Sequence, residues 1–410
     1  MPYIQRAITP ILKQRVSTSK CMLLVGARQV GKSTLIKHEF KDFNRANFDD
    51  RLTRMQAKEE PKLFLLNNPQ PLFIDEVQKE SSILEDIKQI ADESDERGMF
   101  LLSGSQKLEL IKGMSESLAG RVSISELTGL SMREIYGVKF NRHFIPTDAY
   151  IKEREKEIVK YDNIWEIIHK GSYPELYDID RDWQEYYSSY VATYLERDIN
   201  ELVAADGITF TKFLTAVAAR TGELLNYSNI AGDVGVSEPT IKNWISILER
   251  TGIVYLLQPY SASALKRAIK TPKLYFRDTG LACYLTRWLT ADTLKCSAVA
   301  GNMFETFVVS EILKSYSNEG KDYRFNIFYY RGKDRNASGE NEIDLVIEED
   351  GVLYPVEIKM SGNPKASMGA TNQVLDKVSD KKRGLGVILC LIDKKTYLRE
   401  NLVALPIEFI

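Results

Sequence analysis

A glycine-rich segment that ends in a lysine and two hydroxyl residues is the strongest chemical signal in the sequence. Residues 25–34 read VGARQVGKST and match the pattern G-x-x-x-x-G-K-[ST] between an apolar strand and a helix. In such a loop backbone N–H groups converge on phosphates, Lys32 reaches the β and γ oxygens, and Ser33 ligates magnesium. A chance glycine-rich turn is the alternative. The pattern predicts a site for ATP and Mg2+ at Gly26, Ala27, Arg28, Gln29, Val30, Gly31, Lys32, Ser33 and Thr34.

Two acids follow the apolar run at residues 72–74. A phosphate loop of this kind requires an acidic partner at the end of a neighbouring strand. We therefore expect Asp75 to hold the magnesium through water and Glu76 to polarise the attacking water as a general base. A solvated pair of acids at a strand end is the alternative.

Hydroxyl and arginine side chains downstream can complete this site. The apolar run at 99–102 leads into Ser103 and Ser105, and the residues leave open which hydroxyl lies beside the γ-phosphate. Arg121 closes the segment SLAGR and can stabilise charge in the transition state, in its own subunit or across an interface. An ordinary surface arginine is the alternative for Arg121.

A second cluster of chemical groups lies near the C-terminus. Asp344 precedes a turn at 349–351, and Glu357 and Lys359 follow it on one face of the next strand. Asp344 and Glu357 can then bind Mg2+ while Lys359 orients water or stabilises a phosphate, which is the logic of metal-assisted phosphodiester cleavage. Glu305, on a preceding helix, is a further candidate ligand. A structural network of ion pairs is the alternative.

Residues 226–252 have helix-turn-helix spacing, and Ser237 is placed to cap the second helix. The outward residues of that helix are mixed in charge, so both DNA reading and a structural or protein-contact role stay open. Residues 266–273 carry four positive charges and no acid, which makes phosphate contact one interpretation and a solvated loop the other.

The elements that must position these groups indicate an α/β protein of several domains. Apolar runs at 21–26, 44–49, 71–75 and 99–103 alternate with amphipathic stretches, which predicts a parallel sheet flanked by helices. Further strands are expected at 325–330, 342–347, 352–358 and 386–392. The predicted domains are an ATPase core at 1–145, a helical lid at 146–205, a winged helix at 206–262 and an α/β domain at 263–410.

Composition narrows the class of protein. The chain has 410 residues and a net charge of −2, so no global positive field draws it to nucleic acid or membrane. Its four cysteines form no CxxC pair, its three histidines have no metal-binding spacing, and no apolar run approaches ~18 residues. With no signal peptide apparent at the N-terminus, we expect a soluble cytoplasmic protein with no membrane partner.

The motifs GARQVGKS, LFIDEVQ, LLSGS and LAGR resemble those of the AAA-superfamily ATPases of the archaeal-type, STAND-related clade, over about residues 1–205. The resemblance implies a lid whose motif matches residues 171–175, with Pro174 near the adenine, and favours Arg121 as an arginine finger. Residues 300–395 resemble the PD-(D/E)xK, or restriction-endonuclease-like, superfamily. Residues 185–361 resemble the domain of unknown function that accompanies these ATPases.

Three functional hypotheses follow. The leading one is an ATPase whose nucleotide state controls a winged helix and a nuclease-like domain acting on DNA or RNA. The second is an ATP-dependent switch that recruits a protein partner, or assembles with itself, and whose C-terminal domain cuts nothing. The third is a DNA-binding regulator that depends on the 238–249 helix face and not on Asp344.

Overall fold

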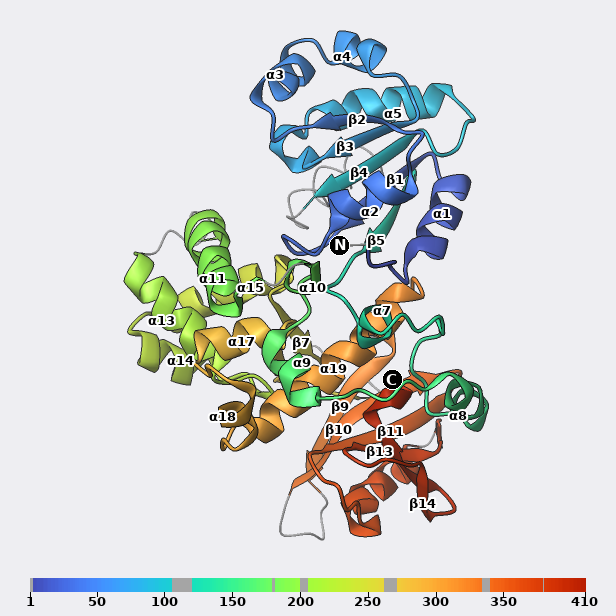
Figure 1. The fold of residues 1–410 in the computed structure, drawn as a ribbon, viewed down its shortest axis with the longest axis vertical. Helices are drawn as coiled ribbons and strands as arrows, with labels where there is room; N and C mark the ends of the chain where they lie inside the picture. Colours follow the sequence, from blue (N-terminus) through green and yellow to red (C-terminus); the bar gives the residue numbers. More distant parts are fainter. Residues whose placement is uncertain are drawn as a thin grey trace.

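The computed structural model describes residues 3–104, 120–178, 181–199, 206–261, 271–333, 340–378 and 380–410. Ser105 and residues 266–270 of the predicted basic segment lie outside these ranges. Three sheets organise the described chain, and Figure 1 shows them with the N-terminal sheet at the top and the C-terminal sheet at the bottom.

The N-terminal sheet is parallel, with the strand order β2-β3-β4-β1-β5. Its strands are β1 (Cys21–Val25), β2 (Asn44–Asn47), β3 (Leu72–Asp75), β4 (Phe100–Gly104) and β5 (Val122–Glu126). Its helices are α1 (Thr9–Thr18), α2 (Lys32–Glu39), α3 (Arg51–Glu59), α4 (Pro61–Asn67) and α5 (Ile83–Glu93). The four predicted strands are confirmed to within two residues, and β5 is an addition to them.

Alternation along β1 explains why helices cover both faces of this sheet. Met22 and Leu24 belong to one apolar cluster with Leu35 of α2, whereas Leu23 belongs to another with Ile87 of α5. Side chains of a strand point alternately to its two faces, so an all-apolar strand needs cover on both sides. The central strand therefore holds the phosphate loop that follows it on a rigid base.

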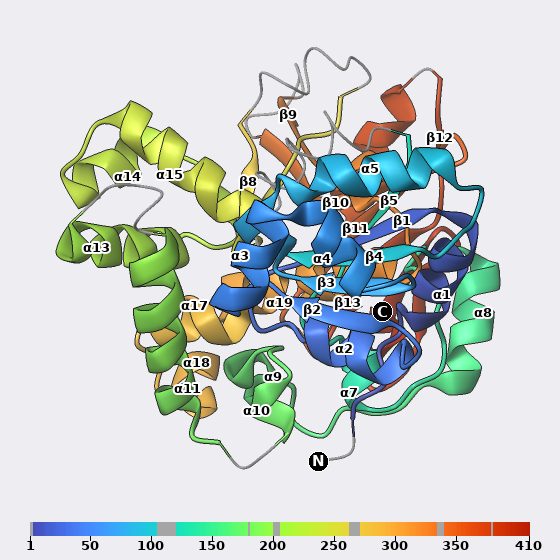
Figure 2. The ribbon, with the colours of Figure 1, turned by 90° about the horizontal axis from the view of Figure 1, so that it is seen from above.

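A helical module lies beside this sheet, on the left in Figure 2. It contains α9 (Ile164–Lys170), α10 (Glu175–Asp178), α11 (Trp183–Tyr190), the π-helix η3 (Val191–Ile199), α13 (Gly207–Ala218), α14 (Tyr227–Val234) and α15 (Glu238–Arg250). A small sheet of order β6-β8-β7 joins β6 (Glu223–Leu224), β7 (Val254–Leu257) and β8 (Lys273–Phe276). Ser237 caps α15 through the Thr240 amide, as predicted. Because β8 pairs with β7, the sheet includes residues on both sides of the predicted boundary at 262/263.

The C-terminal sheet has the order β14-β15-β13-β11-β10-β9, and β12 pairs with β11. The strands are β9 (Ile327–Lys333), β10 (Glu340–Glu349), β11 (Val352–Lys359), β12 (Lys382–Arg383), β13 (Gly386–Cys390), β14 (Thr396–Arg399) and β15 (Leu402–Pro406). Helices α17 (Thr279–Leu285), α18 (Ala291–Lys295) and α19 (Ala300–Asn318) precede it. The four predicted strands are confirmed. The predicted turn is tight, with Asp350 and Gly351 both at positive φ (49° and 77°).

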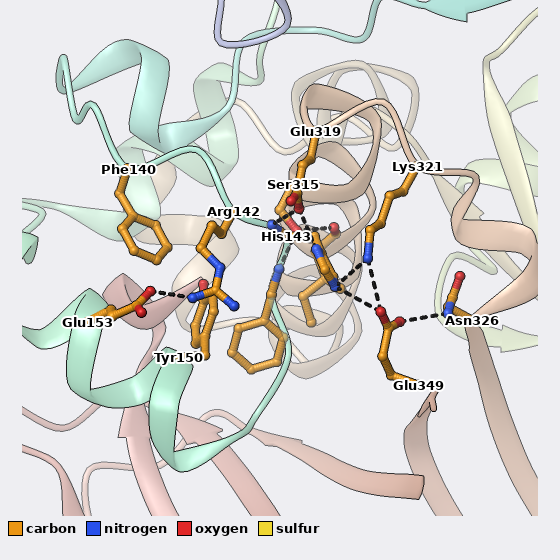
Figure 3. A network of polar contacts seen from close by, with 12 residues as sticks. Phe140, Arg142, His143, Tyr150, Glu153, Ser315, Glu319, Lys321, Asn326 and Glu349 are labelled. Atoms are coloured by element: carbon orange, nitrogen blue, oxygen red, sulfur yellow. Dashed lines mark hydrogen bonds and ion pairs between the residues drawn. The ribbon is translucent and has the colours of Figure 1, made fainter. Parts of the chain in front are cut away.

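Helix α19 fastens the two large sheets together. Its Glu311 accepts from the amide of Met132 in α7 (Met132–Ile135), and its Lys314 donates to the carbonyl of Leu130. Figure 3 shows the connection that follows α7, where Ser315 and Glu319 accept from the amides of Phe144 and His143. The side chains of α19 are buried along most of its length. The ATPase sheet and the C-terminal core are therefore joined through the buried side chains of α19.

Gly171 offers a test of the packing inside the helical module, where it lies against Tyr187 of α11. Its backbone (φ 84°, ψ −163°) is a conformation almost exclusive to glycine, and a Cβ there would lie 2.3 Å from the Tyr187 hydroxyl. We expect Gly171→Ala to lower the free energy of unfolding by about 2 kcal/mol or more beyond the effect of Gly137→Ala. Gly137 also has a positive φ (65°), but a Cβ there meets nothing within 4 Å. Urea unfolding of both variants measures the difference, and equal losses would contradict the expectation.

Candidate functional site

The glycine-rich loop after β1 lies beside a cavity of about 480 Å³. Gln29 and Gly31 have positive φ (64° and 94°), and the loop ends where α2 begins at Lys32. A Cβ on Gly26 would lie 2.3 Å from the Leu127 carbonyl oxygen, so only glycine fits beside β5. The cavity is lined by Tyr3, Ile4, Arg6, Arg28, Gln29, Gly31, Lys32, Ser33, Thr34, His38, Glu76, Leu130, Pro174, Glu175 and Asp178.

The Lys32 ammonium is buried inside the loop. Its Nζ donates to the carbonyl oxygens of Gly26 and Ala27, at 3.0 Å each. Burial lowers the pKa of Lys32, and the charges of Glu76 and Asp75 oppose that shift. Because the two groups that accept hydrogen bonds from Lys32 are neutral carbonyls, phosphate oxygens, which are charged acceptors, would bind this cation more strongly.

Asp75 is the last residue of β3 and Glu76 follows it, and their side chains have different surroundings. Asp75 is buried and accepts a hydrogen bond from Ser103, which lies at the end of the adjacent strand β4. Glu76 lines the cavity with positive φ (53°), and the Gln78 amide donates to its carboxylate. Of the two serines left open by the sequence, Ser103 contacts the acid at the phosphate edge of the sheet.

The N-terminal segment forms a wall of the cavity that no motif indicated. Arg6 donates to the carbonyl oxygens of Val30 (2.8 Å) and Thr128 (2.7 Å) and pairs with Glu134 at 2.9 Å. Tyr3 lines the same cavity. A lone arginine and a lone tyrosine near the chain start carry no local pattern, so only the fold reveals their place.

Pro174 and Arg121 lie at opposite ends of the ATPase module. Pro174 lines the cavity. Arg121 precedes β5, at the edge of the sheet where β1 begins, and its side chain pairs with Asp92 in the last turn of α5. The phosphate loop leaves the other end of β1. The structure therefore brings Pro174 to the phosphate loop and does not bring Arg121 there within one chain.

The C-terminal cluster assembles Asp344, Glu357 and Lys359. The register that pairs Leu345 with Val356 sets Asp344 opposite Glu357. Lys359 Nζ lies 2.8 Å from Asp344 Oδ2 and 2.8 Å from Glu357 Oε2. Glu357 is buried, and its Oε1 has no hydrogen-bond partner. Burial, followed by the charge of Asp344, raises the pKa of Glu357 to about 8.

Glu305 lies at the edge of the same cluster and has partners of its own. It accepts from the Tyr275 hydroxyl at 2.6 Å and from Lys273 Nζ at 3.3 Å. Lys273 also pairs with Glu342 at 2.5 Å and is buried. Burial and the charge of Asp344 raise the pKa of Glu305. The interpretation of Lys273 as part of a phosphate-contacting loop is therefore wrong, because its buried ammonium group pairs with Glu305 and Glu342.

These acids can attract a cation. In the part of the chain that the structure describes, no three His, Cys, Asp or Glu side chains are grouped closely enough to hold a metal ion in this arrangement. However, the unpartnered Glu357 Oε1 and the raised pKa of Glu357 reflect more buried carboxylate than the adjacent lysines neutralise. The carboxylates of Asp344, Glu357 and Glu305 are ligands of the type that divalent cations prefer, but in this arrangement Lys273 and Lys359 lie among them.

The predicted reading helix, α15, presents little positive charge. Lys242 is exposed but pairs with Glu238 at 2.7 Å and lies over the Tyr227 ring. The apolar face of α15 packs inward through Trp244 against Phe210 and Phe213. The side chains free to meet a partner are thus mixed in charge, as the sequence indicated.

Three family models match separate parts of the chain. Residues 18–136 match an AAA domain, residues 161–292 match a domain of unknown function (DUF8612), and residues 300–410 match another (DUF4143). The AAA match, together with the cavity at the glycine-rich loop, supports an AAA-type domain that binds ATP.

Curated relatives cover most of the chain. Uncharacterized protein Mb2031c of Mycobacterium bovis and uncharacterized protein Rv2008c of Mycobacterium tuberculosis are each 27% identical over 375 residues, which is 89% of this chain and 76% of the relative. Their names state no activity, so the role of the C-terminal module has to be argued from its own residues.

Two solved structures show only a weak likeness to this chain. AMPPCP-bound DnaA from Aquifex aeolicus is 14% identical, with 59% of this chain and 85% of that chain covered, at a TM-score of 0.27. Protein VC1899 from Vibrio cholerae is 11% identical with 94% of each chain covered, at a TM-score of 0.18. Both scores are too low to support an argument. Among the described helices, none combines the length and the apolar character that crossing a bilayer requires.

The raised pKa of Glu357 predicts a pH-dependent stability. The folded state holds the proton more tightly than the unfolded chain, so this contribution is complete below about pH 4.5 and is lost as pH rises through about 8. Relative to Glu357→Gln, we expect the wild type to lose stability between about pH 5 and pH 8, by an order of 1 kcal/mol or more. Urea unfolding in EDTA at several pH values measures it. The exposed Glu400→Gln is the control, and parallel profiles for wild type and Glu357→Gln would contradict the prediction.

Proposed function

We propose that this protein is an ATP-hydrolysing switch whose nucleotide state controls a winged-helix and nuclease-like module that acts on nucleic acid. The observation that carries the proposal is the direct contact between the phosphate loop and the helical module, which contains both the predicted lid and the predicted winged helix. Gln29 accepts from the Tyr186 hydroxyl at 2.8 Å, Arg28 lies over the Tyr194 ring, and a side chain on Gly252 would meet Ala27 at 3.6 Å. A change in the conformation of the phosphate loop therefore alters its contacts with α11, η3 and the end of α15.

At the phosphate loop, the residues have separable tasks. Lys32 is placed to exchange the carbonyls of Gly26 and Ala27 for phosphate oxygens. Ser33 and Asp75 would hold Mg2+, which supplies charge neutralisation, with Asp75 acting through water. Ser103 keeps Asp75 oriented. Glu76 lines the cavity from the end of β3, directly after Asp75, and orients the attacking water.

The same proposal assigns the remaining residues of the ATPase module. Pro174 contacts the adenine, since it lines the cavity beside the N-terminal segment. Arg121 acts as an arginine finger on a neighbouring copy, because it lies at the far edge of its own sheet. The active form is then a homo-oligomer. We place it in the cytoplasm, where its four free cysteines stay reduced.

The C-terminal module supplies the nucleic-acid chemistry. Helices α13, α14 and α15 with the sheet β6-β8-β7 have the composition of a winged helix. Asp344 and Glu357, with Glu305 as a further ligand, would hold Mg2+, and Lys359 would stabilise charge on the scissile phosphate. The supporting observation is the unpartnered, buried Glu357 Oε1 next to Lys359.

The alternative is a switch that recruits a protein partner and cuts nothing. Helices α3 and α4 expose four apolar side chains, and Leu52 and Leu66 are 70% and 77% exposed. The other two are Met55 and Leu63. An apolar surface of this kind is typical of protein contacts. The neutralised Lys242 of α15 also favours a partner other than DNA.

One experiment separates these functions. We expect the wild type to hydrolyse ATP with Mg2+ and to cleave labelled DNA or RNA, tested as single strands, duplexes and branched substrates with Mg2+ or Mn2+. Lys32→Ala and Glu76→Gln should each lower ATP turnover at least ~100-fold. Lys359→Ala should abolish cleavage and leave ATP turnover within about twofold, because the two sites use different residues.

Circular dichroism must first show that each variant is folded, and Lys381→Met, another lysine of the C-terminal domain that pairs with Glu348, serves as the matched control for Lys359. ATP turnover without cleavage under any condition would contradict the nuclease role and favour the partner-recruiting switch. Absence of both activities would contradict the proposal as a whole.

A further inference from the structure

Strand β8 joins the two candidate sites. Its four residues, Lys273–Phe276, are all buried, and it is the central strand of the sheet β6-β8-β7. Lys273 at its start reaches the acids of the C-terminal cluster. Directly after its end, Arg277 reaches Glu126 of the ATPase sheet and Asp278 reaches Ser172 of the helical module. At about 3.3 Å per residue, Lys273 and Arg277 are only ~13 Å apart along the chain direction.

At the start of β8, Lys273 acts as a cation for two acids. Its Nζ lies 2.5 Å from Glu342 Oε1 and 3.3 Å from Glu305 Oε1, and its side chain is 5% exposed. Tyr275, on the same face of the strand, donates to that Glu305 oxygen at 2.6 Å. The strand therefore sets the position of Glu305 through two of its four residues.

At the end of β8, Arg277 contacts β5, the strand beside the one from which the phosphate loop leaves. Its Nη1 lies 2.9 Å from Glu126 Oε1, and Glu126 pairs in the sheet with Val25, the residue before the loop. Asp278 accepts from the Ser172 amide at 2.6 Å and from the Tyr187 hydroxyl at 2.7 Å. Ser172 lies two residues before Pro174 of the cavity wall. The end of β8 thus contacts Glu126, which pairs with the residue before the loop, and Ser172, two positions before Pro174.

We propose that Lys273 is an internal cation that takes the place of a metal ion among the acids, and that β8 moves it when the nucleotide state changes. The inference rests on the proposed function and names the regulation of its C-terminal site. With Lys273 in place, the Glu305 carboxylate pairs with the Lys273 ammonium group. With Lys273 withdrawn, Glu305 joins Asp344 and the unpartnered Glu357 Oε1 as ligands for a divalent cation. Lys273 is a positioning residue.

Charge explains why the lysine and a metal ion exclude each other. An ammonium group and a divalent cation that share carboxylate ligands repel strongly in a buried site, where solvent screens little. All four residues of β8 pair with β7, so the strand cannot stretch or compress on its own. A displacement of one end of β8 is therefore transmitted to its other end. A shift at Glu126 or Ser172 therefore reaches Lys273 as a shift of the whole strand.

The first test is metal binding without nucleotide, measured by electron paramagnetic resonance of added Mn2+ on the full chain. Lys273→Met should raise the affinity for Mn2+ about tenfold or more. Lys273→Arg should not raise it. Adding Asp344→Asn to Lys273→Met should remove the gain. An unchanged or weaker affinity in Lys273→Met, or a gain that survives Asp344→Asn, overturns the internal-cation role.

A second variant covers the case in which Lys273→Met leaves its acids unpaired and fails to fold. Lys273→Met with Glu342→Gln removes one charge of each sign and keeps Glu305, Asp344 and Glu357, so the gain in Mn2+ affinity should persist. Lys381→Met, in the same domain, is the matched control and should bind Mn2+ as the wild type does.

The second test is the affinity for a fluorescent ATP analogue with Mg2+. Coupling is reciprocal, so Lys273→Met/Glu342→Gln should change this affinity about fivefold, and the change should disappear when Arg277→Gln is added. Nucleotide binding that is identical in all variants overturns the coupling through β8 and leaves ATP binding standing. Failure of the wild type to bind the analogue overturns the proposed function itself.

Discussion

The ion pair between Arg277 and Glu126 is the contact on which the arrangement of the molecule depends. Burial lowers the pKa of Arg277, but the charge of Glu126 and the nearby tyrosines outweigh it and raise the pKa, so the guanidinium stays charged. The pair joins the edge strand of the ATPase sheet to the central strand of the small sheet. Removing either partner would leave the other charge unpaired in a largely buried position, which would lower the stability of the fold. Because Arg277 is followed by Asp278, which holds the Gly171-Ser172 segment, the same two residues fix the helical module as well.

This contact explains why the phosphate loop is not an independent unit. The loop leaves β1, whose neighbour β5 ends at Glu126, and its own side chains touch α11 and η3. On the other side, Arg6 ties the loop to α7, and α7 is held by Glu311 of α19. The geometry of the loop and the packing of the C-terminal domain are thus linked by two routes. The AAA-type domain is therefore packed against the rest of the chain on two sides.

Local patterns predicted the features whose causes are local. The glycine spacing of the phosphate loop, the apolar strands and the Asp350-Gly351 turn each follow from neighbouring residues, and the structure has them where expected. The hairpin also brought Asp344 to Lys359, as strand alternation requires. The parts that sequence could not give depend on distant partners. Lys273 looked like part of a basic surface loop because its acids, Glu305 and Glu342, are 32 and more residues away. Arg6 and the placement of Arg121 relative to the loop follow from the order of strands, which no local pattern encodes.

The central claim is that nucleotide at the phosphate loop changes the C-terminal cluster through β8. Hydrogen–deuterium exchange of the full chain with and without ATP and Mg2+, in a Glu76→Gln background that retains the nucleotide, tests it most directly. The account predicts altered exchange at the loop and also in peptides that contain residues 272–278 and 340–359. Changes confined to residues 18–136 would contradict it, because the ATPase domain would then bind nucleotide without informing the rest of the molecule.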